Sequence, residues 1–107
     1  MDAKQKIISY YVDELNKRNF AVLNDVVADK VIIDSKSITR DEYKKIIDSR
    51  IAEFPDYQVK IKKMNTKGDV VVLSWERIGT SAKTGEKLRE ELRSEYRIID
   101  ERICEVR

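Results

Sequence analysis

The first part of the chain places its apolar residues three and four positions apart, the spacing of one face of a helix. This pattern predicts a helix from about residue 3 to residue 18. A second, shorter helix follows, and we expect the side chain of Asn19 to cap it. A β-branched run at residues 30–34 then predicts a short strand that ends in a carboxylate. The apolar positions of the two helices are Ile7, Ile8, Tyr11, Val12, Leu15, Phe20, Leu23, Val26 and Val27.

A third helix has the clearest start signal in the chain. Thr39 and Glu42 have the spacing of a capping box, in which each side chain satisfies the backbone N–H of the other residue. Ile38 and Tyr43 flank the box at positions where two apolar side chains pack together. Pro55 ends the run, because the residue before a proline avoids helical backbone. The apolar face of this helix is Tyr43, Ile46, Ile47, Ile51 and Phe54.

Beyond Pro55 the apolar period changes from helical to two, which is typical of strands. Helices therefore come first along the chain, and most of the strands follow. This separation predicts a single α+β domain over residues 1–107, in which a curved antiparallel sheet wraps over the helices. The strands predicted after the third helix are residues 57–62, 70–79, 88–99 and 102–106.

Charge and cysteine content limit the partners and the compartment. Charged residues make up 39% of the chain, but their signs nearly cancel, at a formal net charge of +2. They are interleaved instead of clustered, so nucleic acid is not an expected partner. The single cysteine, Cys104, excludes an internal disulfide bond and fits a reducing compartment. The chain shows no signal-peptide pattern and no membrane-spanning apolar run. We therefore expect a cytoplasmic protein that does not bind membranes.

The absence of histidine and the scarcity of glycine exclude several kinds of catalytic and binding site. The chain has no histidine, which excludes imidazole acid–base catalysis, Ser–His and Cys–His pairs, and most zinc sites. Its three glycines do not form a P-loop or a dinucleotide-binding fingerprint. We expect neither a metal site nor a cofactor.

Four strings, in this order and spacing, resemble one family. They are "VVADKVIID", "FPDYQVKI", "GDVVVLSWERIGT" and "YRIIDERICEV". Together they resemble the SnoaL-like polyketide cyclases and ketosteroid isomerases of the nuclear transport factor 2-like superfamily. The resemblance implies a cone-shaped α+β fold with a pocket between the concave sheet face and the helices. Two features depart from the family: Glu101 stands where glycine usually serves the last turn, and the "SKSIT" connection is short.

The resemblance carries few catalytic groups onto this chain. It places the tyrosine of the steroid isomerases, which donates a hydrogen bond to an oxyanion, on Tyr11. It places their general base on Ser35, with Asp34 one position before, and their oxyanion-hole aspartate on Ser94. The His and Asp of the cyclases fall near Ser81 and Ser94. A serine without histidine cannot act as a general base near neutral pH. Asp34 is either a pocket base, if the register shifts by one residue, or an exposed strand-end carboxylate.

Strand alternation predicts which side chains face the pocket. Arg77 and Glu90 are charged positions on a mostly apolar face, and a symmetric hairpin between their strands would set them opposite each other. We expect a cross-strand ion pair at the pocket mouth, or two side chains that merely reach solvent. Trp75 and Tyr96 fit either the core or the pocket wall. The predicted pocket residues are Tyr11, Leu15, Phe54, Leu73, Trp75, Arg77, Glu90, Leu92, Ser94 and Tyr96.

The strand predicted over residues 70–79 carries Val70, Val72 and Ile78 on its opposite, convex face. An apolar stripe on an exposed sheet face usually marks an association surface. We therefore expect a homodimer joined through this face.

Three hypotheses about function remain open at this point. The first is a small-molecule-binding protein with an apolar pocket, a small apolar ligand and no standard acid–base set. The second is an isomerase- or cyclase-like enzyme that uses Tyr11 and Asp34, both weak candidates for catalytic residues, with or without Glu90. The third is a dimerising interaction domain whose pocket is filled by side chains. An open cavity would separate the first hypothesis from the third.

Overall fold

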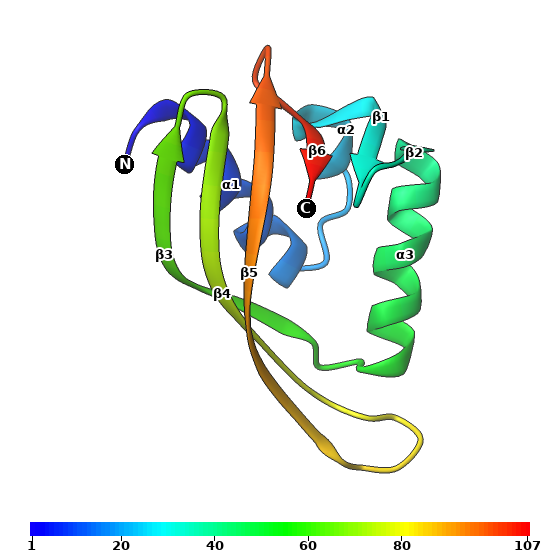
Figure 1. Ribbon diagram of the computed structural model, residues 1–107. Helices are drawn as coiled ribbons and strands as arrows, with labels where there is room; N and C mark the ends of the chain where they lie inside the picture. Colours follow the sequence, from blue (N-terminus) through cyan, green and yellow to red (C-terminus); the bar gives the residue numbers. More distant parts are fainter.

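The computed structural model describes all 107 residues (Figure 1). Its helices are α1 (Ala3–Asn16), α2 (Val22–Val26) and α3 (Arg40–Glu53). Its strands are β1 (Val27–Ile33), β2 (Lys36–Thr39), β3 (Gln58–Lys67), β4 (Val70–Thr80), β5 (Lys87–Ile99) and β6 (Arg102–Val106). They form one six-stranded sheet in the order β2-β1-β6-β5-β4-β3. The predicted α+β class is confirmed. No helix has the length and apolar character needed to cross a membrane.

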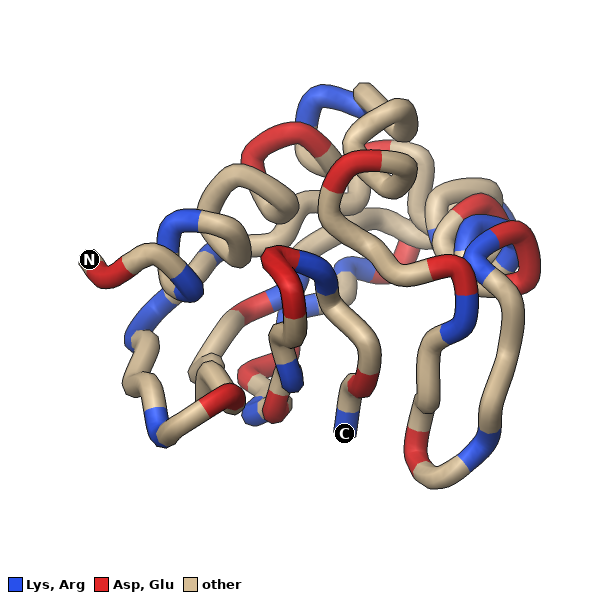
Figure 2. The backbone as a smooth tube through the Cα atoms, turned by 90° about the horizontal axis from the view of Figure 1, so that it is seen from above, with Lys and Arg blue, Asp and Glu red and all other residues tan.

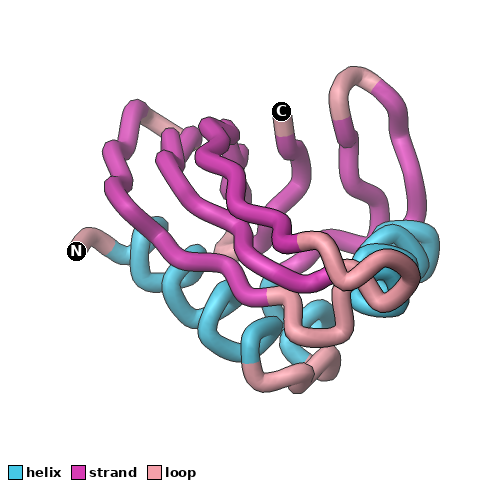
Figure 3. Tube along the Cα trace, turned by 90° about the horizontal axis from the view of Figure 1, so that it is seen from below, coloured by secondary structure: helices cyan, strands magenta, loops and turns pink.

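The sheet bends around the helices, as Figure 3 shows. Neighbouring strands are antiparallel except β1 and β6, which run parallel. α1 packs against β3 at one edge of the sheet, and α3 packs against β1 and β2 at the other. The two long helices thus lie toward opposite edges, and the middle of the concave face lies between them.

The "SKSIT" segment is more than a connection. Residues 36–39 form β2, which pairs antiparallel with β1 as an edge strand. Only Ile38 of this strand is buried. A strand with one inward apolar side chain has no alternation to detect, which is why the sequence pattern did not predict it.

The predicted cap of the second helix is wrong. α2 has Ala21 at its N-cap position, and no side chain caps it. The Asn19 amide instead donates a hydrogen bond to the carboxylate of Glu14 at the end of α1. Val22, Leu23 and Val26 of α2 are all buried, so tertiary packing holds this single helical turn without a cap.

The hydrophobic core lies between the helices and the concave face. α1 contributes Ile8, Tyr11 and Val12, and the sheet contributes side chains from its central strands. Each of these residues is at most 9% exposed, so they form the buried core of the fold. The remaining buried members of the cluster are Val22, Leu23, Val26, Val27, Val31, Ile38, Tyr43, Val71, Leu73, Ile98 and Ile103.

The convex face of β4 is less apolar than the three aliphatic side chains suggested. Val70, Val72 and Ile78 share this face, and each is partly buried. Ser74 and Glu76 lie on the same face between them, because side chains alternate along the strand. The stripe is therefore interrupted in the middle of the strand.

Glu76 is the only buried charged residue in the protein, with 6% of its surface exposed. Its carboxylate lies 3.4 Å from the Arg89 guanidinium and 4.0 Å from the Lys62 ammonium. The neighbouring basic side chains cover it, and the paired charges offset its loss of water. Along the rest of the backbone, basic and acidic residues are likewise interspersed, as Figure 2 shows.

Two hairpins turn on residues with left-handed backbone. Asp34 and Ser35 have φ angles of 46° and 73°, and Asp100 and Glu101 have 52° and 63°. Two-residue turns of this kind match the twist of the strands and favour glycine at the second position. Glu101 and Ser35 occupy those second positions, so each adopts a conformation that costs a side-chain-bearing residue about 1–2 kcal/mol.

The predicted capping box of α3 is confirmed. The Thr39 hydroxyl accepts a hydrogen bond from the Glu42 backbone N–H, and the Glu42 carboxylate accepts one from the Thr39 backbone N–H, both at 3.1 Å. Ile38 and Tyr43 on either side are both buried. The box therefore fixes the residue at which α3 begins and the direction in which Tyr43 points.

We predict that Thr39→Ala lowers the free energy of unfolding by about 0.5–2 kcal/mol, because it removes the hydroxyl that satisfies a backbone N–H at the helix start. Chemical denaturation measures the change. Ser37→Ala is the matched control, since Ser37 is exposed on the adjacent strand and its hydroxyl makes no hydrogen bond within the chain. Equal midpoints for the two variants would contradict the prediction.

Candidate functional site

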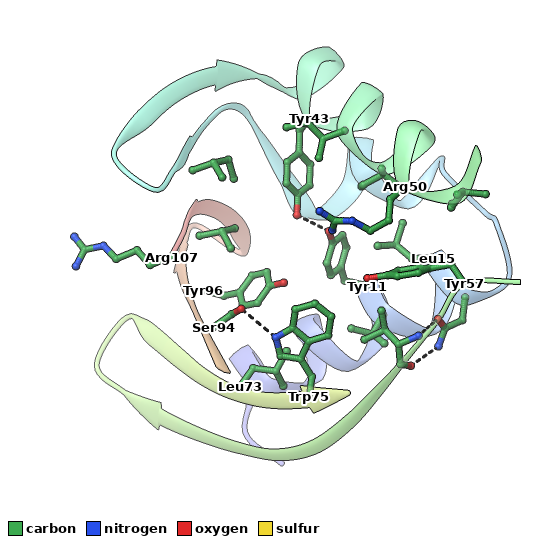
Figure 4. Close-up of a pocket in the computed structure, with 18 of the residues that line it drawn as sticks. Tyr11, Leu15, Tyr43, Arg50, Tyr57, Leu73, Trp75, Ser94, Tyr96 and Arg107 are labelled. Carbon is green, nitrogen blue, oxygen red and sulfur yellow. Dashed lines mark hydrogen bonds between the residues drawn. The ribbon is translucent and has the colours of Figure 1, made fainter. Parts of the chain in front are cut away.

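A cavity of about 270 Å³ opens between the concave sheet face, α1 and α3 (Figure 4). It is lined by 20 residues, 14 of them hydrophobic, which matches the mostly apolar composition of small-molecule sites. Its volume is near the lower end of the range for such sites, roughly 300–1,000 Å³. The cavity can therefore hold a molecule of a few rings.

Six of the ten predicted pocket residues line this cavity. They are Tyr11 and Leu15 from α1, Leu73 and Trp75 from β4, and Ser94 and Tyr96 from β5. Strand alternation predicted the inward direction of the four sheet residues correctly, because β4 pairs with β5 without a break in register from Val70 to Thr80.

The other four, Phe54, Arg77, Glu90 and Leu92, lie outside the cavity lining. Phe54 packs over Gly79, where a Cβ atom would lie only 3.0 Å from the Phe54 Cβ. Arg77 and Glu90 lie opposite each other in the half of the β4–β5 hairpin that extends past the helices in Figure 1. Phe54 is the C-cap residue of α3, and Leu92 is the β5 partner of Trp75.

The predicted Arg77–Glu90 ion pair is confirmed. The two residues are directly opposite in the β4–β5 register, and the Glu90 carboxylate accepts hydrogen bonds of 2.6 and 3.0 Å from the guanidinium. Burial lowers the pKa of Arg77, but the hydrogen bond with Glu90 contributes to a net increase. Because both side chains are partly exposed, the pair contributes little to stability. Neither residue lines the cavity, so the pair does not lie at its mouth.

Two tyrosine hydroxyls meet inside the cavity. The oxygen atoms of Tyr11 on α1 and Tyr43 on α3 lie 2.6 Å apart, so one hydroxyl donates a hydrogen bond to the other. The ring of Tyr96 packs edge-on against Tyr11, with centroids 6.3 Å apart. Burial raises the pKa of all three tyrosines. Their hydroxyls are therefore protonated at physiological pH and can donate hydrogen bonds.

Arg50 is a cavity residue that the sequence analysis missed. It lies seven residues after Tyr43 on the same face of α3, and its guanidinium lies close to the Tyr11–Tyr43 pair in Figure 4. Its charge lowers the pKa of Tyr11, Tyr43 and Tyr96, although the larger effect of burial keeps all three values raised. The sequence did hold a signal: Arg50 interrupts the apolar face of α3 between Ile47 and Ile51.

Tyr57, which directly precedes β3, also lines the cavity. Its hydroxyl oxygen is buried and has no hydrogen-bond partner in the protein. The Arg77 guanidinium is near enough for the hydroxyl to help raise the pKa of Arg77, but the two groups do not form a hydrogen bond. In Figure 4 the ring points from the cavity wall toward Tyr11. The period-2 pattern made Tyr57 the first residue of a predicted strand, and nothing in the sequence indicated that its hydroxyl would lack a partner.

Ser94 is not a free polar group. Its hydroxyl accepts a hydrogen bond of 3.0 Å from the indole N–H of Trp75 on the neighbouring strand. The two side chains fix each other on the floor of the cavity (Figure 4). The Ser94 hydroxyl is therefore engaged as an acceptor and keeps its own proton for donation.

The turn between β1 and β2 decides the geometry of Asp34 and Ser35. Both belong to the two-residue hairpin turn, so neither points to a strand face and the expected register argument does not apply. Asp34 is exposed and lies at the border of the cavity, whereas Ser35 is outside its lining. Ser81 lies in the loop after β4, where its hydroxyl accepts backbone N–H groups of Lys83 and Thr84. No cluster of three or more carboxylate or cysteine side chains could hold a metal ion.

The profile of the SnoaL-like domain matches residues 8–106 of the chain. The protein therefore belongs to the SnoaL-like family, as its sequence strings indicated. No curated protein sequence matches it.

Solved structures share the fold at low sequence identity. A SnoaL-like polyketide cyclase from Agrobacterium tumefaciens is 18% identical, with a TM-score of 0.91 over 99% of this chain and 89% of that one. A protein of unknown function with a cystatin-like fold from Xanthomonas campestris is 18% identical, with a TM-score of 0.83 over 97% and 87%. An NTF2-like protein of unknown function from Burkholderia pseudomallei is 11% identical, with a TM-score of 0.84 over 99% and 88%. These likenesses establish the fold and leave the reaction open.

The buried tyrosines give a prediction about alkaline pH. Folding favours the neutral form of Tyr11, Tyr43 and Tyr96, so their stabilising effect is complete below the unfolded-state pKa of about 10 and is lost as the pH rises above it. Absorbance of tyrosinate at 295 nm, followed with circular dichroism, should show that Tyr11, Tyr43 and Tyr96 ionise in a phase that coincides with unfolding. Tyr11→Phe should remove one tyrosine from that phase. Ionisation of all five tyrosines before unfolding would contradict the prediction.

Proposed function

We propose that this protein binds a small, mostly apolar molecule in the cavity between α1, α3 and the concave sheet face. The observation that supports the proposal is the open cavity of about 270 Å³ with its largely hydrophobic lining. Each 100 Å² of apolar ligand surface removed from water there would contribute about 2.5 kcal/mol to binding. The open cavity favours this hypothesis over an interaction domain with a filled pocket.

The polyketide cyclase from Agrobacterium tumefaciens suggests the type of ligand. A polyketide is a carbon-rich molecule with a few oxygen atoms, which suits an apolar wall with a small number of hydroxyl groups. On this chain those groups belong to Tyr11, Tyr43, Tyr57 and Tyr96. We infer a ligand of one to a few rings, bound by apolar contact and oriented by tyrosine hydrogen bonds.

The proposal is limited to binding because the cavity offers one carboxylate as a base. Asp34 is the only acidic residue that lines it, and Asp34 is exposed at the border. The tyrosine hydroxyls that could hold an oxyanion lie inside, under α1 and α3. An isomerase- or cyclase-like reaction would require a ligand that reaches from these hydroxyls to Asp34.

We predict that the purified protein binds 2-naphthalenemethanol, a neutral two-ring probe. Isothermal titration calorimetry measures the affinity, and the indole N–H resonance of Trp75, the single tryptophan, reports the location. Ile47→Trp should abolish binding, because Ile47 lines the cavity and a larger ring would fill it. Ile32→Trp should leave binding intact, because Ile32 is exposed on β1 away from the cavity. Absence of binding up to millimolar probe would contradict the proposal.

A homodimer through the convex sheet face is the second part of the proposal. Val70, Val72 and Ile78 support it, although Ser74 and Glu76 reduce the apolar area that a partner copy could cover. A contact of this composition would place the Glu76 charge cluster in the interface, where complementary basic groups of the second copy lie on the neighbouring strands.

We predict that light scattering gives the mass of a dimer at micromolar concentration and that Val72→Asp gives a monomer, because an unpaired carboxylate is costly in an apolar contact. Ile32→Asp is the matched control: it introduces the same change at an exposed isoleucine on β1. Circular dichroism checks that both variants are folded. A monomeric unmodified protein would end this part of the proposal.

A further inference from the structure

The cavity carries more positive charge than an apolar ligand requires. Three arginines are among its lining residues, Arg18, Arg50 and Arg107, against one acidic residue, Asp34. Excess charge of one sign in a cleft with low-dielectric walls attracts ligands of the opposite sign. The ligand is therefore expected to carry negative charge.

Only one of these guanidinium groups is free to bind a ligand. Arg18 donates hydrogen bonds to the backbone carbonyls of four residues, Leu15, Asn16, Pro55 and Tyr57. Arg107 is exposed and pairs with Glu105 at 2.9 Å, and its side chain points away from the cavity in Figure 4. Arg50 forms no hydrogen bond and no ion pair within the protein, although it is only partly exposed. A guanidinium binds carboxylate oxygens strongly, so an unpaired arginine in a mostly apolar cavity favours an anionic ligand.

Hydrogen-bond donors share the cavity with Arg50. In Figure 4 the hydroxyl ends of Tyr43, Tyr57 and Tyr96 point toward the middle of the cavity, and the Arg50 guanidinium lies beside the hydroxyls of Tyr11 and Tyr43. The Tyr57 hydroxyl is buried without a partner. Within the Tyr11–Tyr43 pair one hydroxyl donates to the other, so the pair keeps one proton for a ligand. A guanidinium fork and several neutral hydroxyls match the acceptor oxygens of a carboxylate.

We propose that Arg50, Tyr43 and Tyr57 form an anion site inside the cavity, and that the ligand is a small, mostly apolar carboxylic acid in its ionised form. This inference rests on the proposed function, because it names the ligand class of the same cavity. The ring system of the acid lies against the apolar wall that includes Leu73 and Trp75, and the carboxylate accepts hydrogen bonds from Arg50 and from Tyr57. Ligand binding then satisfies both groups that the free protein leaves without partners.

The test compares two probes that share one ring system. 2-Naphthoate is a carboxylate, and 2-naphthalenemethanol is its neutral counterpart. Hydrogen bonds to charged groups are worth about 1.5–3 kcal/mol, so titration calorimetry should give the acid a dissociation constant roughly 10- to 100-fold below that of the alcohol. Arg50→Gln should remove this preference, because it should weaken binding of the acid roughly 10- to 100-fold more than binding of the alcohol. Arg50→Lys should keep part of the preference, because it keeps the charge and loses the fork.

A matched control separates the cavity from general charge. Lys45→Gln removes one positive charge from an exposed position on the same helix, outside the cavity, and should leave the preference for the acid unchanged. Tyr57→Phe should weaken binding of the acid several-fold more than binding of the alcohol. The Trp75 indole resonance and circular dichroism check that each variant is folded.

The outcomes distinguish this inference from the proposed function. Equal affinity of the unmodified protein for the two probes, or a preference that survives Arg50→Gln, would overturn the anion site and leave the apolar pocket in place. Failure of both probes to bind would overturn the proposed function and the anion site together. A preference that both Arg50→Gln and Lys45→Gln reduce equally would show long-range attraction and would also overturn the anion site.

Discussion

The architecture depends on where the two long helices contact the sheet. α1 packs on β3 and α3 packs on β1 and β2, and β3 and β2 are the two edge strands. A curved sheet held at both edges encloses space over its middle strands, and residues of β4 and β5 form the floor of that space. The Tyr11–Tyr43 hydrogen bond joins the two helices across it. The direction of Tyr43 in turn depends on the capping box at Thr39, so one local motif at the start of α3 supports the geometry of the cavity.

Two energetically unfavourable placements of polar groups lie at the cavity. An unpartnered buried hydroxyl such as that of Tyr57 costs about 1–3 kcal/mol relative to a satisfied one. An arginine on the apolar face of α3 adds a further conflict between pattern and position. Elsewhere polar groups are satisfied: Glu76 has two basic partners, and Asn16 exchanges hydrogen bonds with the backbone of Val59. Polar groups without partners at a cavity are the pattern expected when a site is built for a ligand.

Membership of the SnoaL-like family establishes the scaffold more firmly than it establishes the chemistry. The resemblance would place catalytic groups on Ser35 and Ser94, but Ser35 lies in a turn outside the cavity, and the Ser94 hydroxyl is engaged by Trp75. The free polar groups come instead from α3 and from the residue before β3, namely Arg50, Tyr43 and Tyr57. The same scaffold thus presents different side chains from different elements, as expected of a fold that hosts unrelated functions.

The sequence by itself determined the features that depend on neighbours along the chain or directly across a hairpin. Period-3.6 and period-2 patterns located the long helices and strands, the Thr39–Glu42 spacing located the start of α3, and the β4–β5 hairpin set Arg77 opposite Glu90. Only the tertiary structure decided that β1 pairs in parallel with β6, that the short polar segment of β2 becomes an edge strand, and that the cavity ends before Arg77. Only the tertiary structure, likewise, brought Arg50, Tyr57 and the Tyr11–Tyr43 pair into one cavity. These residues come from separate elements, and the absence of a partner for a polar group can be known only when everything packed around it is known.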